Sequence, residues 1–183
     1  RKNRKPLILK GARQVGKTWL MKEFGRSHFK YTAYVNFDNN KNMANVFDGD
    51  YNIDRILLAI NIETGVKIHP QETLIIFDEI QENPKAIASL KYFCEDAPEY
   101  AVIAAGSLLG VAIHKGVSFP VGKVDTLDLN PLSFREFLLA IGEEGLAYHP
   151  LGCSSRPHTV TAAATTRPPM VGVPCLALWA AGP

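Results

Sequence analysis

Cysteine is scarce in this 183-residue chain, and long hydrophobic runs are absent. The three cysteines, Cys94, Cys153 and Cys175, form no C-x-x-C pair, which argues against a zinc signature and a disulfide framework. The five histidines lack metal-binding spacing as well. No apolar run approaches the ~18 residues that suggest a membrane span. We therefore expect a protein of the reducing cytoplasm, without a membrane partner.

A strong charge of either sign is also lacking. The formal net charge is +2, which argues against a domain devoted to nucleic acid but leaves room for a local patch. Seven basic residues do occur from Arg1 to Lys17, before the first acidic residue. Apart from Lys17, we interpret them as a solvated N-terminal edge. With 46% apolar and 21% charged residues, the composition is that of an ordinary globular domain.

One motif of the chain indicates its chemistry directly: G-x-x-x-x-G-K-[ST], the pattern of phosphate-binding loops. Its two glycines let the backbone turn its N–H groups inward, where they can bind the α- and β-phosphates of a nucleotide. Lys17 is predicted to reach the β- and γ-phosphates, and the Thr18 hydroxyl to hold Mg²⁺. The motif, here called the phosphate loop, consists of Gly11, Ala12, Arg13, Gln14, Val15, Gly16, Lys17 and Thr18.

Apolar periodicity predicts strands that alternate with helices. Such alternation indicates an α/β fold of the P-loop NTPase type, with a doubly wound parallel sheet of about five strands flanked by helices. Strands are expected at residues 7–9, 32–37, 74–77, 101–105 and 121–129, and a loop with one helical turn at 39–52. Helices are expected at 18–24, at 53–64, from Pro84 onward and at 134–141, with stops at Gly25, Gly65 and Gly142.

Capping signals mark the start of two of these helices. Asn83 precedes Pro84 as a cap precedes a first helical residue. Ser133 and Glu136 form the capping box S-x-x-E, which is typical of a helix N-terminus. The helix that begins at Pro84 would place Ile87, Leu90 and Cys94 in the core. The helix at 134–141 would have an apolar stripe of Phe134, Phe137, Leu138 and Ile141. Leu132 and Phe137 lie at its staple positions.

The composition changes near Gly145. Residues 146–183 are rich in proline, alanine and threonine and keep no helical or strand period. We therefore place the end of the nucleotide-binding core near residue 145, and expect this core, residues 1–145, to be truncated at its N-terminus, because the chain begins at Arg1 without an initiator methionine. The tail at 146–183 is expected to be disordered or translated out of frame.

The second chemical motif is Phe77-Asp78-Glu79, at the end of the expected strand 74–77. Asp78 is predicted to hold Mg²⁺, because in a P-loop fold the strand beside the phosphate loop ends near the metal. Glu79 would then face the γ-phosphate and polarise the attacking water. Ser107, after the strand at 101–105, is either a γ-phosphate sensor or a plain Gly-Ser turn.

Structural roles are expected for Asn36 and Asp38. The charged residues Lys115, Lys123 and Arg135 are expected to be solvated, and they are also candidates to act on the nucleotide site of a neighbouring subunit.

These motifs together resemble the AAA-superfamily ATPase domain of a large group of bacterial and archaeal proteins, most of them known only as ATP-binding proteins. The resemblance covers roughly residues 5–145 and is carried by the phosphate loop, F-D-E-I-Q at 77–81, A-G-S-L at 105–108, F-P-V-G-K-V at 119–124 and L-N-P-L-S-F-R-E-F at 129–137. It implies nucleotide contacts at Gly16, Lys17 and Thr18, a metal at Asp78, a catalytic base at Glu79 and a sensor near Ser107.

Two features depart from the family pattern. Lys123 stands where members usually have arginine, which weakens any role for it as a finger on a neighbouring subunit. Members also continue into a C-terminal domain that looks like a restriction-endonuclease fold, and nothing after Gly145 matches it.

The sequence therefore predicts binding of ATP with Mg²⁺ and slow hydrolysis to ADP and phosphate. ATP is favoured over GTP because the N-K-x-D guanine signature is missing and Asp78 is followed by Glu79. The alternative is an ATP-binding switch that recruits protein or DNA, with negligible turnover, and such a partner would bind through regions outside this chain. A small-molecule kinase is disfavoured by the adjacent Asp-Glu pair. The oligomeric state is left open.

Overall fold

The computed structural model describes residues 4–38, 40–106 and 119–143. Within them, the residues up to Asn130 belong to one compact unit, and those from Pro131 onward belong to a second. The two units are described separately below. The predicted boundary near residue 145, and the tail that follows it, lie outside the described residues.

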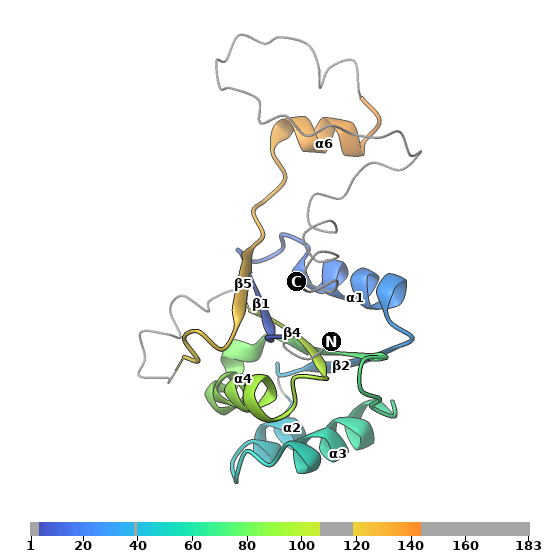
Figure 1. Cartoon of the computed structure of the whole chain (residues 1–183). Helices are drawn as coiled ribbons and strands as arrows, with labels where there is room; N and C mark the ends of the chain where they lie inside the picture. Colours follow the sequence, from blue (N-terminus) through green and yellow to red (C-terminus); the bar gives the residue numbers. More distant parts are fainter. Residues whose placement is uncertain (1–3, 39, 107–118, 144–183) are drawn as a thin grey trace. The chain divides into compact units, whose positions relative to one another are not determined.

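The first unit is built on a sheet of five strands, all of whose pairings are parallel. The strand order is β2-β3-β4-β1-β5, so β4 lies between β1 and β3 (Figure 1). The predicted fifth strand, 121–129, begins too early, because residues 121–124 form a turn and pairing with β1 starts at Asp125. The strands are β1 (Leu7–Lys10), β2 (Tyr31–Asn36), β3 (Thr73–Asp78), β4 (Ala101–Gly106) and β5 (Asp125–Asp128).

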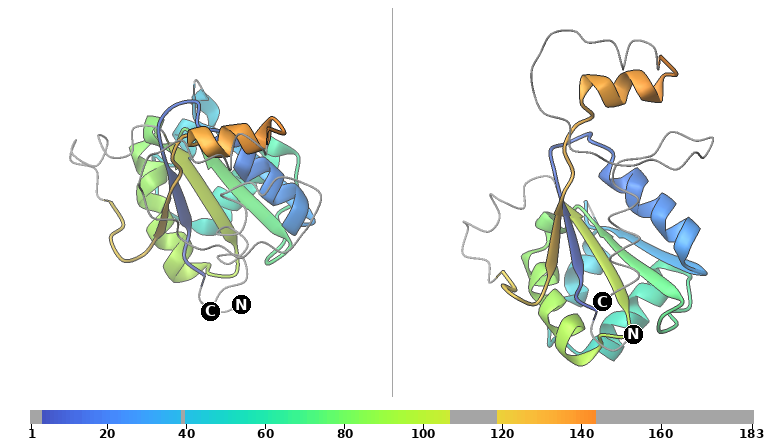
Figure 2. Two further views of the ribbon diagram at one scale, coloured as in Figure 1. Left: turned by 90° about the horizontal axis from the view of Figure 1, so that it is seen from above. Right: turned by 45° about the horizontal axis from the view of Figure 1, so that its top comes forward.

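Helices cover both faces of this sheet, as the predicted doubly wound fold requires. Helix α1 lies on one face, and α2, α3 and α4 lie on the other (Figures 1 and 2). The elements are α1 (Lys17–His28), α2 (Lys41–Val46), α3 (Ile53–Thr64), the 3₁₀ helix η1 (Ile80–Glu82) and α4 (Pro84–Asp96). The predicted caps are confirmed: the Asn83 side chain accepts from two backbone N–H groups of α4, and Gly65 ends α3 at φ 68°.

Side-chain alternation along β3 decides which face each residue serves. All six residues of this strand are buried. Leu74 and Ile76 belong to the apolar cluster on the α1 face, whereas Ile75 and Phe77 belong to the cluster formed with α2, α3 and α4. Because successive side chains of a strand point to opposite faces, Asp78 follows Leu74 and Ile76 and projects toward α1.

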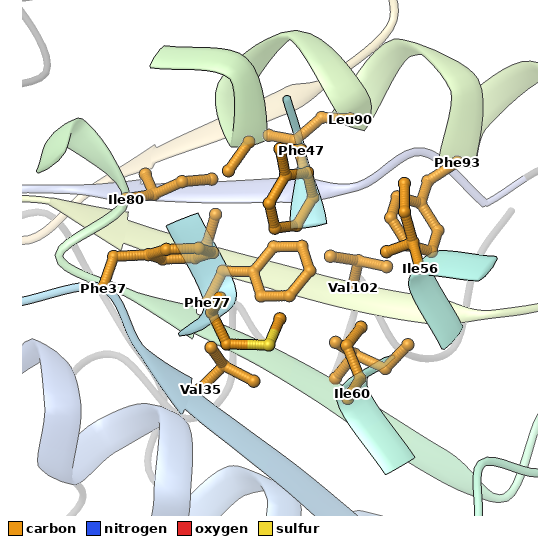
Figure 3. Packing of buried hydrophobic residues seen from close by; sticks show 14 of the residues in the cluster. Val35, Phe37, Phe47, Ile56, Ile60, Phe77, Ile80, Leu90, Phe93 and Val102 are labelled. Carbon is orange, nitrogen blue, oxygen red and sulfur yellow. The ribbon is translucent and has the colours of Figure 1, made fainter. Parts of the chain in front are cut away.

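An aromatic cluster holds the end of β3 on its other face. The Phe77 ring makes edge contacts with the rings of Phe37, Phe47 and Phe93, at centroid distances of 5.5, 6.1 and 6.1 Å (Figure 3). Phe47 is fully buried directly after α2, so the helical turn expected within residues 39–52 is confirmed as a short helix that anchors a core residue. The residue before Asp78 is therefore fixed by close packing.

Two sequence expectations about helix interiors are wrong. Gly25 was expected to stop the first helix, yet α1 continues to His28, and Gly25 is buried inside it. A Cβ at Gly25 would lie 2.6 Å from Thr32 Oγ1. The glycine therefore serves close packing between α1 and β2. In α4, Ile87 and Leu90 are buried as predicted, but Phe93 is fully buried where Cys94 was expected.

The second unit contains α6 (Phe134–Ala140) among its described residues. Its predicted capping box is confirmed: Glu136 N donates to Ser133 Oγ at 3.3 Å, and Ser133 N donates to Glu136 Oε2 at 2.7 Å. Of the expected apolar stripe, Leu138 is buried, whereas Phe134, Phe137 and Ile141 are exposed. None of the helices in the described ranges combines the length and apolar character needed to cross a membrane.

The position of Gly25 leads to a prediction opposite to helix propensity. Alanine is normally favoured over glycine inside a helix by about 1 kcal/mol, but here its methyl group would clash with Thr32. We expect Gly25→Ala to lower the free energy of unfolding by about 1–3 kcal/mol in urea titrations. Adding Thr32→Ala should restore most of that loss, because it removes the clashing atoms. Stabilisation by Gly25→Ala alone would contradict the close contact of α1 with β2.

Candidate functional site

The phosphate loop connects the end of β1 to the start of α1, and its glycines serve two different needs. Gly16 caps α1 at φ 91°, a conformation that other residues rarely adopt. At Gly11 a side chain is excluded by close packing, because a Cβ there would lie 2.3 Å from the carbonyl oxygen of Leu129, which follows β5. Within the described residues, no side chain caps α1, so its first N–H groups are available to an anion.

The remaining loop residues differ in exposure. Ala12, Arg13 and Gln14 are exposed and Val15 is half-buried, whereas Lys17 is only 6% exposed. The Lys17 ammonium donates to the carbonyl oxygens of Gly11 at 3.0 Å and Ala12 at 2.5 Å. Among the described residues, no carboxylate forms an ion pair with Lys17. A buried cation balanced only by carbonyl dipoles favours the binding of an anion beside it.

Asp78 is the centre of the hydrogen bonds in this site. Its Oδ2 accepts from Thr18 Oγ1 at 2.7 Å and from the Tyr34 hydroxyl at 2.9 Å, and its Oδ1 accepts from Glu79 N at 3.1 Å. The side chain is 2% exposed, so these donors replace the water that a carboxylate normally binds. The Thr18 hydroxyl and the Asp78 carboxylate are hard oxygen donors, and they suit Mg²⁺.

Asp78 lies near the phosphate loop although its strand does not pair with β1, because β4 pairs with both. Thr18 reaches Asp78 from the first turn of α1, and Figure 2 shows that this helix crosses one face of the sheet. The juxtaposition follows from the helix that covers the sheet as well as from the strand order.

Glu79 follows β3 in an unusual backbone conformation. Its φ of 51° and ψ of 42° lie in the left-handed region, where residues other than glycine are strained. This turn breaks the strand alternation, so Glu79 does not follow Phe77 into the core and is half-buried. Its Oε2 accepts from Gln81 Nε2 at 2.6 Å. A carboxylate held in this way could orient and polarise water.

These groups border one cavity of about 680 Å³. The phosphate loop forms one wall, and Asp78 and Glu79 lie at the end of β3. Tyr34 and Asn36, near the end of β2, form another part of the lining. The cavity lies at the carboxyl ends of parallel strands, where open α/β sheets usually bind their ligands. Each predicted site residue that the structure describes is thus part of, or adjacent to, one cavity.

Sequence reasoning missed Tyr34 and Gln81. Tyr34 lies two residues before Asn36, which pairs with Asp78, so Tyr34 and Asp78 share one face of the sheet. Burial and the hydrogen bond to Asp78 raise the pKa of the Tyr34 phenol, which therefore remains a donor at neutral pH. The strand register could have identified Tyr34, but the sequence alone does not provide that register.

Among the other candidates that the structure describes, Asn36 and Asp38 line the cavity, whereas Lys123 and Arg135 do not. Ser107 and Lys115 lie outside the described residues. Lys123 pairs with Glu95 of α4 at 2.8 Å, and this hydrogen bond raises the pKa of Lys123. Arg135 belongs to the second unit. Asn36 accepts from Asp38 N at 2.9 Å, in keeping with the structural role expected for both.

The chain is similar to known ATPases. A family model described as an AAA domain matches residues 3–138. Among solved structures, the Walker-type ATPase PABY2304 of Pyrococcus abyssi shares the fold, with a TM-score of 0.50 and 16% identity over 79% of this chain and 54% of that chain. The expected α/β fold of the P-loop NTPase type is thereby confirmed.

Two further solved structures are more distant. A chain of the E. coli MS115-1 HORMA:CdnC:Trip13 complex has a TM-score of 0.45 and 14% identity, over 84% of this chain and 57% of that one. PCH-2 of C. elegans has a TM-score of 0.39 and 14% identity, over 84% of this chain and 42% of its own. The present chain thus spans about half the length of these structures. No curated protein matches it.

The geometry around Asp78 predicts a measurable role for the Tyr34 hydroxyl. Tyr34→Phe keeps the ring, over which Lys22 Nζ lies 3.7 Å from the centroid, but removes one donor to the buried carboxylate. We expect a loss of about 1.5–3 kcal/mol in the free energy of unfolding, measured by urea titration. Tyr51→Phe is the control, because the Tyr51 ring stacks on Tyr92 and the substitution keeps that contact. Equal losses of unfolding free energy in the two variants would show that the hydrogen bond from Tyr34 to Asp78 adds no measurable stability.

Proposed function

Because the chain belongs to the AAA domain family, which its residues 3–138 match, we propose that it binds Mg²⁺-ATP and hydrolyses it to ADP and phosphate. The observation that carries the proposal is the hydrogen bond from Thr18 to Asp78. It joins two motifs that are 60 residues apart in the sequence into one oxygen-rich site beside a buried lysine.

The phosphate loop would bind the triphosphate through backbone and side chain together. Its N–H groups and the N-terminus of α1 would hold the α- and β-phosphates. Lys17 would exchange its two carbonyl contacts for the β- and γ-phosphate oxygens, so that its charge remains compensated. Such an exchange is favourable because phosphate carries the full negative charge that the carbonyl groups lack.

Thr18 and Asp78 are the residues that would hold Mg²⁺, directly or through water. The ion, when bound, neutralises charge that develops on the β- and γ-phosphate oxygens. The fixed orientation of Asp78, with three hydrogen bonds, would reduce the entropy that must be lost when the metal binds.

Glu79 would orient the water that attacks the γ-phosphate. Glu79 directly follows the proposed metal ligand Asp78 in the sequence, and both residues line the same cavity. Polarisation of that water by Glu79, with positive charge from Lys17 in the same cavity, fits phosphoryl transfer to water. Ser107 remains a predicted sensor.

The predicted alternative is an ATP-dependent switch that recruits a protein or DNA partner with negligible turnover. It uses the same binding residues and differs only in the role of Glu79. A kinase would release little phosphate without an acceptor, so release of phosphate from ATP in water alone separates hydrolysis from that class. The cytoplasmic location and the coupling to conformational change stay predictions.

Lys17→Met tests the binding site. It keeps most of the side-chain stem but removes the charge that would contact the phosphates, so affinity for a fluorescent ATP analogue should fall at least about 100-fold. Folding should persist, because the lost contacts are to two loop carbonyls and Lys17 lines the cavity instead of packing in an apolar cluster. Lys91→Met, an exposed lysine of α4, is the matched control and should bind normally. Wild-type affinity in folded Lys17→Met would place the nucleotide elsewhere.

Glu79→Gln and Asp78→Asn test the order of roles in hydrolysis. Glu79→Gln should keep ATP-analogue binding and lower turnover by about 10²–10⁴-fold, because it removes the charge that polarises water. Asp78→Asn should weaken Mg²⁺-dependent binding itself. Normal turnover in Glu79→Gln, with loss in Asp78→Asn, would remove Glu79 from the role of base. A folded wild type that binds Mg²⁺-ATP without any phosphate release would instead support the switch.

A further inference from the structure

We propose that Gln81 is a positioning residue for Glu79: its amide group holds one carboxylate oxygen so that the other faces the cavity. The inference rests on the proposed hydrolysis and extends it by naming the residue that orients the base. It is carried by the 2.6 Å hydrogen bond from Gln81 Nε2 to Glu79 Oε2. Glu79 also lines the cavity of the site.

The direction of this hydrogen bond follows from the chemistry of its neighbours. Gln81 Nε2 lies 3.4 Å from Glu82 Oε1 as well as close to Glu79. Both neighbours are carboxylates, which only accept hydrogen bonds when ionised. The NH₂ end of the amide must therefore face them, since the carbonyl end would repel both. This orientation leaves the amide oxygen directed away from Glu79.

The backbone presents Gln81 to Glu79 in a defined turn. Glu79 N donates to Asp78 Oδ1 at 3.1 Å, and Glu82 N donates to Glu79 O at 3.0 Å, which closes the turn of η1. The left-handed conformation of Glu79 has moved it out of the strand alternation, so β3 no longer determines where its side chain points. A glutamate has three rotatable side-chain bonds, and the amide of Gln81 restrains the last of them.

The two ends of the Gln81 amide contribute unequally, because only the donor end has a partner among the described residues. The Oε1 atom of Gln81 is buried and has no hydrogen-bond partner among the described residues. An orphaned amide oxygen is destabilising, and an apolar side chain of the same length would avoid that cost. The NH₂ group of Gln81 donates to Glu79, the carboxylate proposed to polarise water. A small loss of stability of this kind is expected at functional sites.

The test compares Gln81→Met with wild type in the presence of saturating Mg²⁺-ATP. Methionine matches the length of glutamine but cannot donate. We expect kcat to fall about tenfold, with KM and the affinity for a fluorescent ATP analogue within about twofold of wild type. Gln81→Leu also lacks the donor and adds no charge beside Glu79 and Glu82, so it should lower kcat in the same way, and it replaces Gln81→Met if that variant does not fold. Lys91→Met, an exposed lysine of α4 outside the cavity lining, is the control and should keep wild-type kcat.

A double-mutant cycle separates positioning from a general structural effect. If Gln81 acts through Glu79, then Gln81→Met should cause no further loss of turnover in the Glu79→Gln background. Wild-type kcat in both Gln81 variants, or a full additional loss on top of Glu79→Gln, would overturn the inference. Failure of the proposed function looks different: a wild type without turnover, or Glu79→Gln with normal turnover, would remove the base itself and this inference with it.

Discussion

The hydrogen bond between Thr18 and Asp78 is the contact on which the site depends. It connects the first turn of α1 to the end of β3 although β4 separates β1 from β3 in the sheet. The contact is possible because α1 lies over the face toward which Leu74, Ile76 and Asp78 point. Without that helix on that face, the phosphate loop and the carboxylates would be two unrelated motifs.

Aromatic packing on the face of the sheet opposite α1 fixes the position of Asp78 in this hydrogen bond. Phe77 is surrounded by the rings of Phe37, Phe47 and Phe93, so the strand end has little freedom to shift. Asp78 is buried next to it and receives hydrogen bonds from Thr18, Tyr34 and the backbone of Glu79. A buried carboxylate without such donors would be destabilising. The residues that stabilise Asp78 are therefore also those that fix it for a ligand.

Charges of both signs border the cavity. Lys17 lies buried among carbonyls of the phosphate loop, whereas Asp78 ends β3 and Glu79 follows it. A triphosphate with a divalent cation matches both signs, because its oxygens would contact the lysine and its metal the carboxylate oxygens. Gln14 of the phosphate loop and Glu79, whose side chain the proposed chemistry uses, both have a positive φ, as does Gln71 outside the cavity lining.

Local patterns in the sequence were sufficient for the strand–helix alternation, the phosphate loop, the Asn83 cap and the Ser133 capping box, because each depends on residues within a few positions of one another. Long-range placement was not accessible in the same way. Gly25 is a helix stop by local rules, yet it allows α1 to approach Thr32. Phe93 and Cys94 differ by one position on α4, and only the direction in which the helix packs decides that Phe93 is buried. The sequence by itself thus determined which groups could bind a nucleotide and a metal. The tertiary structure alone decided that Tyr34 reaches Asp78, because residues of β2 and β3 meet through strand register and helix crossing, which no local spacing encodes.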